Sequence, residues 1–197
     1  MAQNSGDLGP SRDPSKTPGK PAIFVLGFDP GSARLGWAAL EIYPALRHAA
    51  SGVLAVDLAS GDIGLARLRA DVGALLVRLA PDRVAIERVA RVHQAPGHFG
   101  PGMATGLVLA AWVAGEVAGL AASRGLEVRT ATREQARRAL GLAGSATDAA
   151  VSLAVRSRVV DWPKRSTEHA RDAAALAMLA AAWAEPCSGL PAVMDAA

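Results

Sequence analysis

The chain has 197 residues, of which 51% are hydrophobic and 20% charged, and its formal net charge is +3. This length predicts one domain with tails, and the apolar fraction is sufficient for a large hydrophobic core. The single cysteine, Cys187, excludes a disulfide framework and a zinc site built from cysteines. Because the first residues lack the apolar segment of a signal peptide, we expect a soluble, cytoplasmic protein.

The pattern of apolar residues predicts alternating strands and helices between two polar tails. Residues 1–21 are rich in Ser, Pro, Gly and Lys, and we expect them and residues 185–197 to be disordered, which leaves a domain at 22–184. The predicted strands are 22–28, 36–42, 52–58, 83–87 and 126–130, and the predicted helices are 63–79, 103–123, 133–140, 144–160 and 167–183. This order predicts an α/β fold with one mixed sheet and helices on its faces.

The first two predicted strands flank an aspartate. The run Ile23–Phe28 is apolar, Asp29 follows it, and Pro30-Gly31 marks a turn before apolar sequence resumes at Gly36. An aspartate at such a strand end is either solvated in the turn or kept for chemistry. Two superfamilies use this hairpin: the actin-like and sugar-kinase ATPases, in which the turn faces phosphate, and the RNase H-like nucleases, in which the aspartate holds metal.

A second carboxylate, Glu87, ends the predicted strand at 83–87. It follows the apolar residues Val84, Ala85 and Ile86, so its position in the sequence pattern repeats that of Asp29. A glutamate at a strand end is often simply solvated, and the residues alone leave both interpretations open.

The helix predicted at 103–123 is unusually apolar, with Glu116 as its only charged residue. Its length would suit a membrane span, but its glycines and the lack of aromatic or basic flanks favour a fully buried helix instead. The spacing of Gly115 and Gly119 permits close approach of another helix, so this helix is also the predicted contact between two copies of the chain.

Two segments are candidates for contact with a nucleic acid. The Gly- and Pro-rich loop at 91–102 contains Arg91 and Phe99, whose ring could stack on an unpaired base. The helix at 133–140 carries the other candidates, which form either a phosphate-binding patch or an ordinary solvated face: Arg133, Arg137 and Arg138.

The last predicted helix carries His169 and Asp172, which lie on one face because they are three residues apart. The rest of this helix is small and apolar, which predicts burial, and a buried aspartate is costly unless it is paired or binds a metal. The alternative is that the helix N-terminus or a basic neighbour satisfies Asp172. With the two acidic strand ends, this pair supplies ligands that suit Mg²⁺ or Mn²⁺, and two such ions can support phosphodiester hydrolysis.

Four motifs, in this order, resemble the RuvC family of Holliday-junction resolvases. They are Phe28-Asp29-Pro30-Gly31-Ser32 with Gly36, then Ala85-Ile86-Glu87-Arg88-Val89, then Gly144-Ser145-Ala146, and finally the helical segment 169–177. The resemblance covers about residues 22–184. It implies an RNase H-like fold, in which a central mixed sheet of five strands is flanked by helices.

The resemblance also implies an activity and a set of partners. The implied activity is metal-dependent cutting of four-way DNA junctions by paired phosphodiester hydrolysis, with two Mg²⁺ or Mn²⁺ ions in each active site. The implied catalytic metal ligands are Asp29, Glu87, His169 and Asp172. The implied partners are branched DNA, a second copy of the chain and a branch-migration helicase, with no membrane.

The chain departs from the family pattern at two positions. The family commonly has an aromatic residue three positions after its glutamate, where this chain has Ala90, and a lysine after Gly-Ser-Ala, where it has Asp148. Phe99 is the predicted substitute for the aromatic residue, and the family's earlier lysine falls near Arg137 or Arg138. These departures leave open an RNase H-fold nuclease for other branched or single-stranded DNA. The ATPase alternative lacks a second phosphate hairpin and an adenosine-binding Gly-Gly.

Overall fold

The structure is a computed structural model that describes residues 22–42, 45–89 and 101–183, without the side chains of 101–104. The two predicted tails fall outside the described residues. So do Arg91 and Phe99, the candidates for DNA contact in the loop, and Ala90, where the chain departs from the family pattern.

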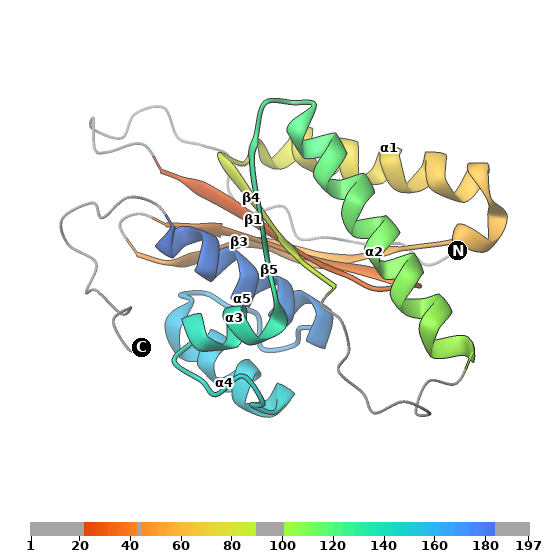
Figure 1. Ribbon diagram of the computed structural model, residues 1–197. Coiled ribbons are helices and arrows are strands. Elements are labelled where there is room, and N and C mark those ends of the chain that lie inside the picture. The colour runs from red at the N-terminus through yellow and green to blue at the C-terminus, as the bar shows by residue number, and fades with distance from the viewer. Residues whose placement is uncertain (1–21, 43–44, 90–100, 184–197) are drawn as a thin grey trace.

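A mixed five-stranded sheet with the strand order β3-β2-β1-β4-β5 forms the centre of the fold (Figure 1). Its strands are β1 (Phe24–Pro30), β2 (Arg34–Glu41), β3 (Arg47–Ala55), β4 (Arg83–Glu87) and β5 (Glu127–Ala131). Strand β2 pairs antiparallel with both β1 and β3, whereas β4 runs parallel to both β1 and β5. This sheet confirms the predicted mixed α/β architecture.

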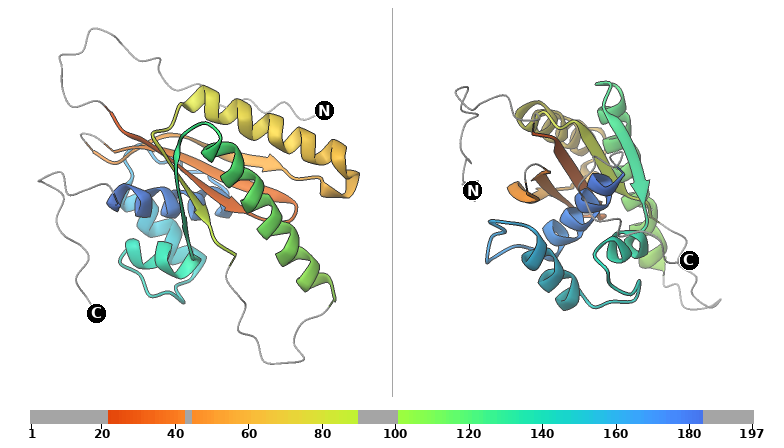
Figure 2. Two further views of the ribbon diagram at one scale, coloured as in Figure 1. Left: turned by 45° about the horizontal axis from the view of Figure 1, so that its top comes forward. Right: turned by 90° about the vertical axis from the view of Figure 1, so that its left-hand side faces the viewer.

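Helices cover both faces of the sheet, with α1 and α2 on one side and α3, α4 and α5 on the other (Figures 1 and 2). Their bounds are α1 (Asp62–Leu79), α2 (Pro101–Ala122), α3 (Arg133–Ala139), α4 (Asp148–Arg158) and α5 (Glu168–Ala182), with a short 3₁₀ helix at Leu58–Ser60. Each face has its own hydrophobic core, and β1 contributes to both: Val25 packs on the α5 side, and Leu26 and Phe28 on the α1 and α2 side. The continuous apolar run of β1 is therefore explained by burial of both of its faces.

The third strand lies earlier in the chain than predicted. Strand β3 spans Arg47–Ala55 and pairs along the whole of β2, with a bulge at Ala39 and Leu40. The predicted range of 52–58 followed the apolar run, but edge-strand pairing also recruits the small and polar residues before Gly52, because half-buried edge positions do not require large apolar side chains.

The prediction that the helix at 103–123 is fully buried is wrong for this chain. One stripe of α2, formed by Val113, Val117 and Ala121, packs on the sheet, whereas Val108 and Trp112 are 68% and 45% exposed. Thr105–Ala122 is the one helical stretch in the described part of the chain that is long and apolar enough to cross a membrane, by length and composition only. Uniform apolarity indicated burial on all sides, but a single sheet can cover only one side of a helix.

Two glycines allow α5 to lie directly on the central strands. A Cβ atom on Gly27 of β1 would overlap the carbonyl oxygen of Ala173, and one on Gly36 of β2 would lie 2.5 Å from the carbonyl oxygen of His169. The face of α5 toward the sheet consists mostly of alanine, including Ala173 and Ala177, so backbone approaches backbone closely. The helix is therefore held near the sheet at its first turns, where the functional candidates lie.

We predict that Gly27→Ala destabilises the protein by about 1–3 kcal/mol or more, because overpacking a tight contact forces backbone shifts. Gly106→Ala on α2 is the matched control, since its Cβ would meet only the Ser32 hydroxyl oxygen, at 3.8 Å. Urea unfolding of the two variants measures the difference. Equal free energies of unfolding for Gly27→Ala and the natural protein would show that the contact is not tight.

Candidate active site

The sheet topology places two carboxylates side by side. Strands β1 and β4 are parallel neighbours whose paired register extends to Phe28 opposite Ile86, and Asp29 and Glu87 follow directly at the same edge. Asp29 is only 3% exposed. Because side chains alternate along a strand, Asp29 points to the same face as Gly27, toward α5. The two acidic strand ends thus converge as the sequence predicted.

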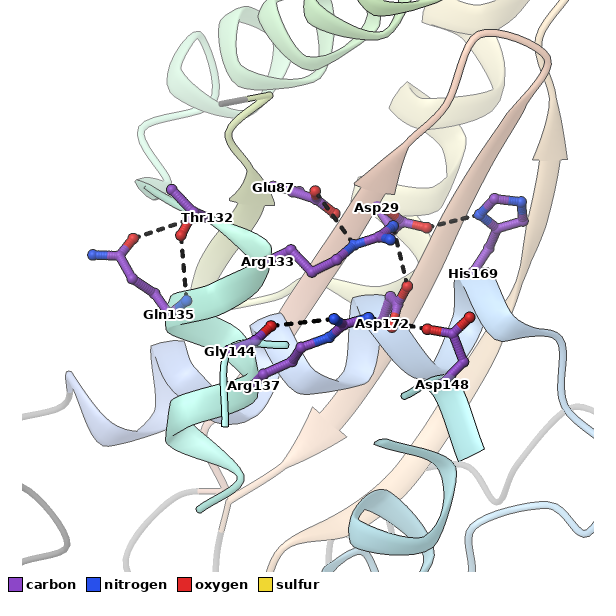
Figure 3. A network of polar contacts seen from close by, with 10 residues as sticks. All are labelled: Asp29, Glu87, Thr132, Arg133, Gln135, Arg137, Gly144, Asp148, His169 and Asp172. Atoms are coloured by element: carbon purple, nitrogen blue, oxygen red, sulfur yellow. Dashed lines mark hydrogen bonds and ion pairs between the residues drawn. The ribbon is translucent and has the colours of Figure 1, made fainter. Parts of the chain in front are cut away.

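Helix α5 brings the histidine and the third carboxylate to this edge. The hydroxyl oxygen of Thr167 caps the helix by accepting a hydrogen bond from the Ala170 amide at 3.1 Å. His169 in the first turn places Nδ1 at 2.7 Å from Oδ2 of Asp29, and Asp172 follows one turn later (Figure 3). The four candidate residues from β1, β4 and α5 therefore gather in one region.

An arginine from α3 lies between two of the carboxylates. Arg133 is the first residue of that helix, which is held by a capping box between Thr132 and Gln135. Its Nη2 lies 3.3 Å from Oδ2 of Asp172, and its Nε lies 3.7 Å from Oε1 of Glu87 (Figure 3). Arg133 is therefore part of the acidic site, and its side chain remains 44% exposed to solvent.

A second arginine of α3 is fixed more firmly. Arg137, whose side chain is 12% exposed, places Nη2 at 3.0 Å from Oδ1 of Asp148, and its Nη1 donates to the Gly144 carbonyl oxygen at 3.2 Å (Figure 3). Arg138 is exposed instead. The ion pair between Arg137 and Asp148 could not be predicted from the sequence, because a contact between two different helices has no signal in local spacing.

Burial disfavours the ionised forms of two carboxylates in this site. Burial raises the pKa of the Glu87 carboxyl to about 8, with help from its hydrogen bond to Asp29 and the Asp29 charge, while Arg133 opposes the rise. Burial likewise raises the pKa of Asp172 to about 6, against the effect of Arg133. Burial lowers the pKa of Arg133 itself, but Glu87, Asp172, Asp29 and Asp148 together outweigh it and raise that pKa.

The donor set suits a hard divalent cation, although the side chains are not arranged as a finished cage. Among residues 22–42, 45–89 and 101–183, no group of three or more His, Cys, Asp or Glu side chains is placed to hold a metal ion as it stands. Three largely buried carboxylates and one imidazole are nevertheless ligands that Mg²⁺ and Mn²⁺ accept, and burial raises the pKa of two of these carboxyls. The positive group between Glu87 and Asp172 is the Arg133 guanidinium.

The sheet order and the helices on both of its faces are those of the RNase H-like class of α/β proteins. Comparison with known proteins places the chain within that class. The family model described as "Crossover junction endodeoxyribonuclease RuvC" matches residues 25–180. The chain belongs to the RuvC family, and this match leaves no support for the ATPase alternative.

Individual relatives agree with the family match. A crossover junction endodeoxyribonuclease RuvC from Paracoccus denitrificans (strain Pd 1222) is 37% identical over 90 residues, which are 44% of this chain and 54% of that protein. The chain thus spans about half the length of this curated relative. The structure of Thermus thermophilus RuvC has a TM-score of 0.63 at 25% identity, over 80% of this chain and 92% of that one. T. thermophilus RuvC in complex with a Holliday junction substrate has a TM-score of 0.64 at 23% identity, with the same coverage.

We predict that the metal-free protein loses stability as the pH rises from 4.5 to about 8. In this range the folded state keeps a proton on Glu87 that the unfolded chain releases, so a rising pH favours unfolding. Melting temperatures in EDTA across this range, for the natural protein and for Glu87→Gln, measure the effect. The variant should gain stability relative to the natural protein as the pH rises, and a difference that does not change with pH would contradict the raised pKa.

Proposed function

We propose that this protein is a metal-dependent endonuclease that resolves four-way DNA junctions by paired phosphodiester hydrolysis. The observation that carries this proposal is the convergence of Asp29, Glu87 and Asp172, all largely buried, in a chain whose residues 25–180 match the RuvC family model. The P. denitrificans relative is named as a crossover junction endodeoxyribonuclease, and the T. thermophilus relative binds a Holliday junction in its structure. Both names support the same substrate and the same reaction for this chain.

In this proposal Asp29, Glu87, His169 and Asp172 hold two Mg²⁺ or Mn²⁺ ions. Such ions supply an activated water and stabilise the leaving oxygen of the phosphodiester. Asp29 is the central ligand, because it lies beside Glu87 at the end of the neighbouring strand and is hydrogen-bonded to His169. The cation would lower the electrostatic cost of three buried carboxylates, so Glu87 and Asp172 would stay ionised at neutral pH.

Helix α3 supplies the positive charge for the DNA backbone. Arg133, Arg137 and Arg138 come from one short helix beside the carboxylates, and phosphate contacts of this kind position DNA without reading its sequence. We assign the same role to Arg91, and a stacking role at an unpaired base to Phe99, as expectations from the sequence. Asp148 stands where the family carries a lysine and is paired with Arg137, so the cutting of other branched or single-stranded DNA is the second candidate function.

A second copy of the chain would cover the exposed stripe of α2. Val108, Trp112, Gly115 and Gly119 recur at helical spacing on the side of α2 that faces away from the sheet, and all four are exposed. Glu116, the only charged residue of the helix, is held by Arg69 of α1 at 2.7 Å and leaves this stripe uncharged. Two copies packed through α2 would carry two active sites, as paired cutting of a junction needs. We also expect a branch-migration helicase as a partner and the cytoplasm as the location.

Asp29→Asn and Asp172→Asn should each lower junction cutting by at least about 100-fold. Changes to residues that only orient metal ligands already cost about 10- to 100-fold in metal affinity or activity. Binding to the junction in Ca²⁺ or EDTA should persist, because the arginines are unchanged. The assay uses labelled four-way junction, flap, single-stranded and duplex DNA, each with Mg²⁺ and with EDTA. Asp71→Asn on α1 is the matched surface control and should cut normally.

The same assay separates the two candidate functions. Preferred, symmetric cutting of the four-way junction supports the first, and preferred cutting of flap or single-stranded DNA supports the second. Nicking that persists in EDTA, or in either aspartate variant, would exclude the proposed metal site.

Trp112→Glu should convert the dimer into monomers, because it places a charge in the middle of the apolar stripe of α2. Val77→Glu is the matched control, since Val77 is an exposed valine on α1, away from that stripe. Sedimentation velocity at micromolar concentration measures both. A natural protein that is already monomeric at that concentration would contradict the proposed interface.

A further inference from the structure

The two arginines of α3 that reach the acidic site are held in different ways. Arg137 is almost enclosed and makes contacts of 3.0 and 3.2 Å with Asp148 and Gly144. Arg133 is 44% exposed, and its contacts to Asp172 and Glu87 are longer, at 3.3 and 3.7 Å. Contacts of 3.0 and 3.2 Å lie within the usual range of N–H···O hydrogen bonds, about 2.7–3.2 Å, whereas those of Arg133 lie beyond it. Arg137 is therefore a fixed part of the framework, whereas Arg133 balances charge through loose contacts and has solvent beside it.

Arg133 faces carboxylate oxygens that a divalent cation would need as ligands. A cation that links Glu87 to Asp172 has to approach oxygen atoms that already face the Arg133 guanidinium. The guanidinium also separates the two carboxylates, which agrees with the finding that the described side chains form no ready group of three metal ligands. Two positive groups cannot share this space, because both would repel each other at short range in a partly buried site.

We propose that Arg133 is the counter-cation of the metal-free site: its guanidinium holds Glu87 and Asp172 in place until a divalent cation binds, and then moves out. This inference rests on the proposed metal site. It makes Arg133 a positioning residue, since it acts on the reaction through the two carboxylates. The presence of Arg133 weakens metal binding, because the cation must displace a positive charge. It also reduces the repulsion between Glu87 and Asp172 when no metal is bound.

Binding of Mn²⁺ to the full-length, metal-free protein without DNA tests the proposal, with free Mn²⁺ measured by electron paramagnetic resonance. Arg133→Gln should bind Mn²⁺ about tenfold more tightly, a factor that corresponds to about 1.4 kcal/mol. In EDTA the same variant should melt at a lower temperature than the natural protein, and Mn²⁺ should reverse that loss. Arg133→Lys, which keeps the charge, should bind Mn²⁺ with nearly natural affinity.

Two control variants separate occupancy of the site from general electrostatics. Arg137→Gln removes a charge nearby without emptying the space between Glu87 and Asp172, so its gain in affinity should be clearly smaller. Arg67→Gln removes a charge on α1 that faces Asp71, and it should leave the affinity unchanged. An equal gain for Arg137→Gln and Arg133→Gln would overturn the proposal, because only general charge would then matter.

A measurement on the natural protein covers the case in which a variant does not fold. The side-chain Nε–Hε resonance of Arg133 should shift during a Mg²⁺ titration with the midpoint of metal binding, while that of Arg137 stays constant. If Asp172→Asn lowers the Mn²⁺ affinity but the Arg133 resonance of the natural protein does not respond to Mg²⁺, the role proposed for Arg133 is wrong and the metal site is still supported. Equal Mn²⁺ binding by Asp172→Asn and the natural protein would remove both the site and this inference.

Discussion

The contact between α5 and the middle of the sheet determines where the chemistry can take place. Gly27 and Gly36 have no side chains to keep the helix away, and Ala173 and the backbone of His169 occupy the space that Cβ atoms would take. The consequence is that the first turns of α5 lie directly over the end of β1. The hydrogen bond of 2.7 Å between His169 and Asp29 depends on this approach.

The second constraint is electrostatic. Three carboxylates from three separate elements are brought together where little water reaches them, and the pKa values of Glu87 and Asp172 rise in response. Arg133 and Arg137 supply the compensating positive charge from a single short helix, each with a different partner. Arg133 lowers the electrostatic cost of bringing Glu87 and Asp172 together, and a divalent cation would lower it in its place.

Much of this could be predicted because the relevant signals are local. The apolar run before Asp29 and the strand that ends at Glu87 both lie within a few residues of the features they predict. The spacing of His169 and Asp172 is enough to predict that they share one face of a helix. Their meeting with Asp29 could be inferred only from the family resemblance.

The remaining features depend on contacts between distant segments. The early start of β3 follows from pairing with β2, and the exposed stripe of α2 follows from the fact that only one side of it meets the sheet. The position of Arg133 between Glu87 and Asp172 requires the placement of α3 against both β4 and α5. From the sequence, Arg133 was indistinguishable from Arg138, which lies on the exposed side of the same helix.

A crystal structure of the Mn²⁺-loaded protein, with the metal located by its anomalous scattering, tests the central claim most directly. We expect an anomalous peak among the carboxylate oxygens of Asp29, Glu87 and Asp172, with the Arg133 guanidinium displaced toward solvent. A peak located elsewhere would contradict the metal site, and a guanidinium that still lies between Glu87 and Asp172 beside the bound ion would contradict the exchange of charges.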